Sequence, residues 1–140
     1  MWEYEARILR IIDADTVDAL LILEPQQLVK MGDGAMWWDF GFYFYAPVAD
    51  AQRLPRTIQR FRLAGIDAPE VRGPERPEGL LASAWLKDFI NKEESMVGPI
   101  KIATEKKGKY GRYLGTLFTD GGLNINEELI RVGHATKYPL

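Results

Sequence analysis

Hydrophobic and polar residues alternate along several stretches of this chain, and each stretch predicts a β-strand. A period of two arises because successive side chains on a strand point to opposite faces of the sheet. Five such stretches spread over the first four-fifths of the sequence predict a mainly β protein. They cover residues 4–12, 17–23, 61–66, 100–104 and 112–119.

Two further stretches have the spacing of helices. Residues 80–91 follow a loop rich in proline and glycine at 71–79, and Asn124 and Glu127 have the spacing of a capping box that opens a second helix ending at Gly133. One helix late in the chain and another near its end predict an α+β fold built on a small antiparallel barrel. The apolar stripe of the first helix consists of Leu81, Ala84, Trp85, Phe89 and Ile90.

Residues 24–58 interrupt this plan. Met31–Gly34 is typical of a turn, and seven of the nine residues from Trp37 to Tyr45 are aromatic. We favour an extended hairpin strand whose aromatic side chains cover the core. The alternative is a surface beside the active site that stacks on nucleic-acid bases.

Composition limits the kind of site that this chain can hold. The 140 residues include no cysteine and one histidine, His134, to which we assign packing or capping at a helix end. Disulfides, thiolate metal sites and multi-histidine sites are therefore excluded within one chain. A metal would be bound mainly by oxygen, which favours Ca²⁺, Mg²⁺ or Mn²⁺ over Zn²⁺.

The charge pattern points to a localised anion site. The net charge of −2 argues against a protein that coats nucleic acid nonspecifically. However, residues 53–62 contain four arginines and no acid, and residues 101–112 contain five basic residues against Glu105 alone. Such stretches suit a short length of phosphate backbone, although the lysines at 106, 107 and 109 are also typical of a solvated turn.

Nothing in the sequence indicates a membrane segment or a leader. No apolar run approaches the length of a membrane span, and Glu3 and Glu5 stand where a signal peptide would be basic and then apolar. We expect a cytoplasmic location for the chain as given, with a mature secreted form left open.

The stretch from Arg60 to Glu70 carries the densest candidate chemistry. A strand bearing Arg62 is followed at once by a turn that presents Asp67 and Glu70. This order places a guanidinium and a set of hard oxygen ligands within one small volume. The combination suits a phosphate held beside a divalent cation.

Four motifs stand in order along the chain: Ile12–Val17, Arg62–Glu70, Lys109–Arg112 and Ile125–Ile130. Together they resemble the landmarks of the staphylococcal nuclease family. The resemblance covers most of the sequence apart from about 35 residues after Leu23, an insertion absent from the short archetype. It implies one domain over residues 1–140, with a five-stranded OB-fold barrel, two or three helices and an insertion at 24–58.

The resemblance also implies an activity, namely that of a Ca²⁺-dependent endonuclease acting on DNA, RNA or both, with one Ca²⁺ ion that Mg²⁺ or Mn²⁺ could replace. We expect a monomer with a nucleic-acid substrate and no membrane partner. The implied metal ligands are Asp15, Asp67 and the backbone carbonyl of Ala68. The implied catalytic residues are Arg62, Glu70 and Arg112, and the implied substrate-binding residues are Lys109 and Tyr110.

Less specific interpretations exist for each of these residues. Asp13 and Asp15, taken alone, are typical of a turn stabilised by bonds from side chain to backbone, and Arg112 alone is typical of a surface strand. The rival functions are a noncatalytic OB-fold module that binds nucleic acid and a purely structural OB domain. Retention of both aspartates, the glutamate and both arginines favours the enzyme.

Overall fold

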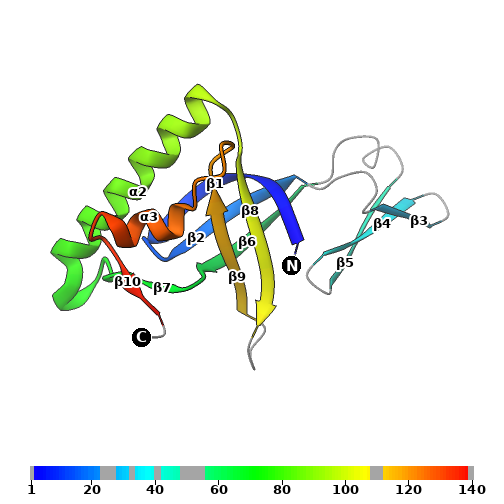
Figure 1. Ribbon diagram of the computed structural model, residues 1–140. Helices are drawn as coiled ribbons and strands as arrows, with labels where there is room; N and C mark the ends of the chain where they lie inside the picture. The colour runs from blue at the N-terminus through cyan, green and yellow to red at the C-terminus, as the bar shows by residue number, and fades with distance from the viewer. Residues whose placement is uncertain are drawn as a thin grey trace.

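Five strands of the computed structural model close into a barrel in the order β1-β2-β6-β9-β8 (Figure 1). The structure describes residues 2–22, 28–31, 34–39, 42–47, 56–107 and 112–138. The barrel strands are β1 (Trp2–Asp13), β2 (Thr16–Ile22), β6 (Arg56–Leu63), β8 (Ile100–Lys107) and β9 (Arg112–Phe118). The predicted α+β, mainly β, five-stranded OB-fold barrel is confirmed.

The pairing of the barrel strands corrects one expectation. β6 and β9 run parallel, with Arg62 opposite Leu114, whereas the other pairings of the barrel are antiparallel. β1 closes the barrel because its first half pairs with β8 and its second half pairs with β2. Two register shifts, at Ile8/Arg10 and Ile11/Asp13, bend this long strand.

The alternation seen in the sequence corresponds to the inside and outside of the barrel. Along β2, every second residue is buried, including Val17 and Leu21. On β6, Phe61 and Leu63 are buried, so Arg62 between them lies on the outer face. The hydrophobic pattern therefore determines which face of β6 carries the arginines.

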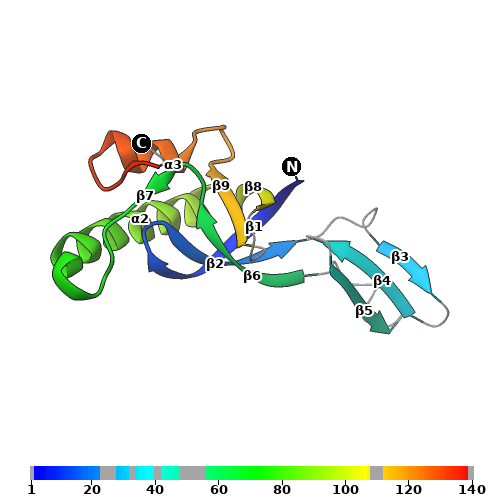
Figure 2. The ribbon, with the colours of Figure 1, turned by 90° about the horizontal axis from the view of Figure 1, so that it is seen from below.

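Two helices cover one side of the barrel, and short elements complete that side. α2 (Arg76–Met96) packs on β1 and β8, and α3 (Ile125–Arg131) packs on β9 and on the β7–β10 pair. Figure 2 shows both helices on the side away from the β3–β5 sheet. The short elements are β7 (Ile66–Asp67), the 3-10 helix η2 (Gly73–Glu75) and β10 (Thr136–Lys137).

The first helix differs from its prediction in both extent and face. It begins at Arg76 rather than at residue 80, because Pro77 is tolerated in a first helical turn and Gly79 is buried against a neighbouring loop. Leu81 is 65% exposed, so it does not belong to the buried stripe, and neither does Ala84. The buried residues are Gly79, Ala82, Leu86 and Ile90.

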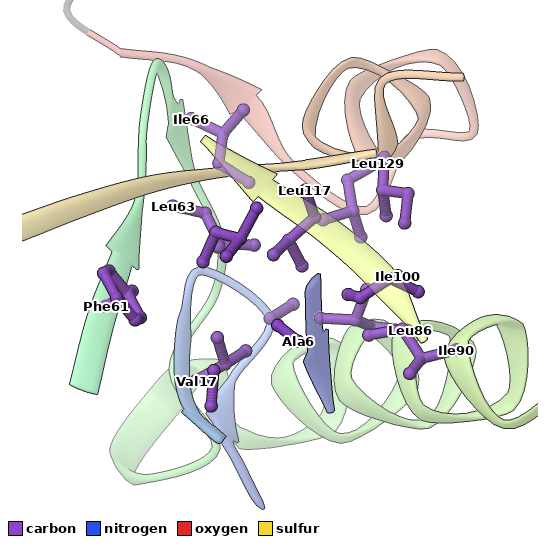
Figure 3. Close-up of a cluster of buried hydrophobic side chains, with 14 of the residues drawn as sticks. Ala6, Val17, Phe61, Leu63, Ile66, Leu86, Ile90, Ile100, Leu117 and Leu129 are labelled. Carbon is purple, nitrogen blue, oxygen red and sulfur yellow. The ribbon is translucent and has the colours of Figure 1, made fainter. Parts of the chain in front are cut away.

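The core fills the barrel and the space beneath α2 (Figure 3). Leu86 and Ile90 of α2 lie beside Ile100 of β8, and all three are essentially inaccessible to solvent. The second helix follows its prediction closely, because the side chain of Asn124 accepts a hydrogen bond from the Glu127 amide at 3.0 Å. This cap and the core together hold α3 against the end of the barrel.

The insertion contains a separate three-stranded sheet in the order β3-β4-β5. The aromatic run predicted as one hairpin strand is divided between β4 (Gly34–Asp39) and β5 (Phe42–Pro47), which pair antiparallel, and β3 (Leu28–Met31) flanks β4. The sheet lies beyond the ends of β2 and β6 (Figures 1 and 2). The aromatic side chains, and with them the expectation that they cover the core, lie outside the described residues.

Candidate active site

Side chains from two strands adjacent in sequence and one distant turn meet where β6 ends. Asp15 comes from the turn between β1 and β2, Arg62 from β6, and Asp67 from β7. The pairing of Thr16 with Arg62 brings the turn to this end of β6, and the opposite end of the same ladder joins the insertion. At a rise of roughly 3.3 Å per residue, the six steps from Arg56 to Arg62 span about 20 Å. The aromatic insertion therefore leaves the barrel at the end opposite to this site, not beside it.

Asp15 is a buried carboxylate held by short-range and long-range bonds. The hydroxyl of Thr16 donates to Oδ1 at 3.0 Å, and the amide of Ala68 donates to Oδ2 at 2.8 Å. The backbone carbonyl of Asp15 also accepts from the Leu63 amide at 2.7 Å. Asp15 itself is 4% exposed. These bonds fix the turn that carries Asp15 against both β6 and the turn at Ala68.

Arg62 divides its guanidinium between two carboxylates. Nη1 lies 3.5 Å from Oδ2 of Asp15, and Nη2 lies 3.4 Å from Oδ1 of Asp67. Nη2 also donates to the carbonyl of Ile66 at 3.5 Å. All three distances are long for charge-assisted hydrogen bonds. Arg62 is therefore held near both acids without being saturated by either.

Glu70 lies in an exposed position on a loop whose backbone is held from two sides. The amide of Val71 donates to Oδ1 of Asp13 at 3.0 Å. On the other side, Gly79 of α2 packs so closely that a Cβ there would lie 2.1 Å from the carbonyl oxygen of Glu70. These two contacts anchor the backbone on which Glu70 lies.

A buried amide joins the site to the rest of the barrel. The side chain of Asn126, 2% exposed, donates to the carbonyls of Ala64 and Gly115 at 3.0 and 3.1 Å and accepts from the Leu117 amide at 3.1 Å. Asn126 therefore ties the turn after Arg62 to β9. All of its polar atoms have partners, which offsets the cost of burying them.

A second arginine on β6 behaves differently. Nε and Nη2 of Arg60 donate to the two carboxylate oxygens of Asp18 at 2.8 and 3.2 Å. The hydrogen bonds and positive charge of Arg60 hold the pKa of Asp18 below its usual value, and Arg10 adds to the effect. This pair forms a bidentate ion pair on the outer face of the barrel.

The oxygen donors at the site suit a hard cation. Among the described residues, no three acidic or histidine side chains gather closely enough to form a metal cluster. A cation here would depend on Asp15 and Asp67, and on backbone and water oxygens for the remaining ligands, which is a mixture that Ca²⁺ accepts. Each oxygen of Asp15 accepts one hydrogen bond in the part of the chain that is described and has a second lone pair.

Of the remaining predicted site residues, the structure describes only the backbone of Arg112. Arg112 is the first residue of β9, two positions before Leu114, the partner of Arg62. Because residues two apart share a strand face, Arg112 belongs to the same sheet face as Arg62. Its side chain, and residues Lys109 and Tyr110 entirely, lie outside the described part of the chain.

Several residues at the site were not predicted from the sequence. Asp13 bonds across the fold to Val71 rather than within its own turn, and the ring centroid of Tyr138 lies 5.3 Å from Cζ of Arg62. Asn126 was part of a motif but had no assigned role. The sequence did carry a sign of this role, because Asn126 is a polar residue at a helix position that the hydrophobic pattern assigns to the core. As predicted, His134 packs at the end of α3, with its ring 5.8 Å from that of Trp85.

Comparison with known proteins identifies the family. The family model described as staphylococcal nuclease homologue matches residues 60–139, more than half of the chain. This region contains Arg62, Asp67 and Glu70, whereas Asp15 precedes it.

Curated relatives are similar over a little more than half of this chain. Endonuclease YhcR of Bacillus subtilis is 31% identical over an alignment of 87 positions, and the match covers 56% of this chain and 7% of that protein. An uncharacterized endonuclease of Escherichia coli O157:H7 is 28% identical over 83 residues, which make up 59% of this chain and 49% of that protein. The chain therefore spans half or less of the length of these relatives.

Among solved structures, the extended Tudor domain of Drosophila melanogaster Papi resembles this chain with a TM-score of 0.57. The match covers 98% of this chain and 100% of that chain at 11% identity, so it supports the fold alone. None of the helices in the described part of the chain is both long enough and apolar enough to span a membrane.

Proposed function

Because the chain belongs to the family of staphylococcal nuclease homologues, we propose that it is a Ca²⁺-dependent endonuclease that hydrolyses phosphodiester bonds of DNA, RNA or both. Two relatives that carry the word endonuclease in their names support this proposal. The observation that carries it is the position of Arg62 between Asp15 and Asp67 at the end of β6.

Arg62 is proposed to bind the phosphate that is cleaved. A guanidinium makes two parallel hydrogen bonds to a phosphate, a geometry that lysine does not reproduce. The long contacts of Arg62 to its carboxylates leave it free to exchange them for phosphate oxygens. Arg112, on the same face of the adjoining strand, is proposed as the second donor, with Lys109 and Tyr110 holding neighbouring phosphate. Donors aimed at developing charge typically contribute a factor of roughly 10²–10³ in rate.

The proposed ligands of the Ca²⁺ ion are Asp15, Asp67 and the backbone carbonyl of Ala68. Support for this set is the bond from the Ala68 amide to Asp15, which keeps residue 68 beside the buried carboxylate. A bound divalent cation supplies positive charge to phosphate oxygens and orients a water. The protein's own part is to hold both carboxylates beside the guanidinium of Arg62, at 3.5 and 3.4 Å.

Glu70 is proposed to act on the attacking water, either as a general base or by orienting it. Its exposed side chain on an anchored backbone suits both roles. Replacement by Gln removes basicity and keeps size, whereas Asp keeps basicity and shortens reach. If Glu70 accepts the proton, Glu70→Gln should be much slower than Glu70→Asp, and its rate should rise with hydroxide after the wild type has levelled off. Equal losses with one pH profile would assign it to positioning.

Incubation with plasmid and single-stranded DNA, in Ca²⁺ or in chelator, tests the proposed activity. We expect cleavage that requires Ca²⁺ and is lost in Arg62→Ala but kept in the matched variant Arg60→Ala. Cleavage that persists unchanged in chelator, with trace metal excluded, would overturn the Ca²⁺ dependence. Binding of DNA without cleavage in any divalent metal would favour the noncatalytic OB-fold module instead.

A further inference from the structure

Among the described residues, the guanidinium of Arg62 has an aromatic neighbour in addition to the two carboxylates and the carbonyl of Ile66. The ring of Tyr138 lies under it, with 5.3 Å between Cζ and the ring centroid. This distance falls within the range of about 6 Å over which a cation is attracted to an aromatic face. Tyr138 is 55% exposed, so this contact lies at the surface of the protein.

Backbone pairing determines where this ring lies. β10 pairs with β7, with Thr136 opposite Asp67. Beyond that pair, the amide of Tyr138 donates to the carbonyl of Gly65 at 2.9 Å. Tyr138 itself follows the end of β10. These backbone bonds join the β7 segment that carries Asp67 to the segment that carries Tyr138, beside Arg62.

An aromatic face restrains a guanidinium differently from a carboxylate. The N–H donors of arginine lie in the plane of the guanidinium and point outward. A carboxylate occupies those donors, as Asp15 and Asp67 do here at 3.5 and 3.4 Å. A ring packed near the guanidinium limits its movement by attraction to the whole cation and accepts none of its hydrogen bonds. The ring therefore holds the guanidinium in place without taking a donor that a phosphate would need.

We propose that Tyr138 is a positioning residue that holds Arg62 in the orientation in which it receives the phosphate. The inference rests on the proposed nuclease function for its effect on turnover. The orientation of Arg62 itself is a property of the folded protein and is measurable without substrate.

Substitution of the ring tests the proposal. Tyr138→Phe keeps the aromatic face and should retain turnover close to wild type. Tyr138→Leu removes it and should lower kcat by roughly 2- to 5-fold, the scale of an exposed cation–π contact, with little change in KM. Lys137→Ala is the matched control, since it alters the residue of β10 that directly precedes Tyr138 and leaves the ring in place. In an Arg62→Ala background, Tyr138→Leu should cause no further loss.

A second readout separates this proposal from the nuclease proposal. The Nε–H resonance of Arg62 in NMR spectra should show a ring-current shift and a high order parameter in wild type and Tyr138→Phe. Both should decrease in Tyr138→Leu. If wild type does not cleave DNA but these changes occur, the nuclease proposal fails and the positioning of Arg62 stands.

Two results would overturn the inference. One is an unchanged order parameter for Arg62 together with unchanged kcat in Tyr138→Leu. The other is an equal loss from Tyr138→Leu in the wild-type and Arg62→Ala backgrounds, because the ring would then contact the nucleic acid directly. Titration of Tyr138→Leu with Ca²⁺ checks that the turn carrying Asp67 remains intact. We expect the variant to bind Ca²⁺ with the same affinity as wild type.

Discussion

Arg60 and Arg62 lie two positions apart on the same outer face of β6, yet they have different surroundings. Arg60 makes two bonds to the carboxylate of Asp18, at 2.8 and 3.2 Å. Arg62 is shared between Asp15 and Asp67 through contacts of 3.5 and 3.4 Å. One arginine is saturated by a single acid, and the other is held near two acids that leave its donors free to be redirected.

The difference originates on the neighbouring strand. Arg60 lies opposite Asp18 in the β2–β6 ladder, so its guanidinium meets a carboxylate directly. Arg62 lies opposite Thr16, which has no charge, and it reaches the acids of two turns instead. The lesson is that strand register decides which arginine forms a surface ion pair and which one is available to a ligand.

The largest expected effect separates the two arginines by turnover. Arg62→Ala should lose roughly 10²-fold or more in kcat while remaining folded, because a charge-stabilising donor is removed. Arg60→Ala, with its guanidinium already committed to Asp18, should stay near wild type. Lysine at position 62 should not restore the full rate. Steady-state cleavage of a labelled oligonucleotide measures all three variants, and equal losses for both alanine variants would remove the distinction.

The acids that contact the two arginines should also differ, in their contribution to Ca²⁺ binding. Asp15→Ala or Asp67→Ala should weaken Ca²⁺ binding by roughly tenfold or more, the scale on which groups at a metal site affect affinity. Asp18→Ala should leave the affinity unchanged. Isothermal calorimetry measures this, and wild-type affinity in the first two variants would mean that the ligands lie elsewhere.

A smaller effect tests the close contact between Gly79 of α2 and the backbone of Glu70. In Gly79→Ala, the new Cβ would lie 2.1 Å from the carbonyl oxygen of Glu70, so the loop must move. We expect the free energy of unfolding to fall by about 1–3 kcal/mol, as for other overpacked sites. Gly121→Ala is the control, since its Cβ would meet nothing closer than 3.8 Å. Urea unfolding that gives the two variants equal stability would show that the contact yields readily.

The smallest expected effect is the pH dependence of the Asp18–Arg60 pair. Arg60 lowers the pKa of Asp18 from its usual 3.8, so the pair stabilises the fold above that pH and loses its contribution as the pH falls through the lowered value. Asp18→Asn should therefore lower the Tm slightly at pH 7, and the difference from wild type should disappear once the pH is below the lowered pKa of Asp18. Because the pair is on the surface, high salt should reduce the difference. A difference that grows toward acid pH would contradict the assignment.

Local sequence patterns were sufficient to predict a large part of this fold. The alternation of β2 and β6, the turn after Arg62 and the cap at Asn124 all involve residues within a few positions of one another. The proximity of Arg62 and Asp67 was predictable for the same reason, because five residues and one turn separate them. The predicted start of α2 was wrong because Pro77 and Gly79 are typical of a loop. Whether a helix accepts them depends on its first turn and on the neighbouring loop, which packs against Gly79.

The remaining features of the site depend on contacts between distant parts of the chain. The bonds from Ala68 to Asp15 and from Val71 to Asp13, and the ring of Tyr138 beside Arg62, each join segments that have no periodic relation in the sequence. Periodicity assigns a residue to a face, but it does not identify the residue opposite. The sequence alone therefore determined the strands, the helix cap and the residue types of the site. Closure of the barrel decided that Asp15, rather than Asp13, lies against Arg62, because only the paired strands bring that turn to the end of β6.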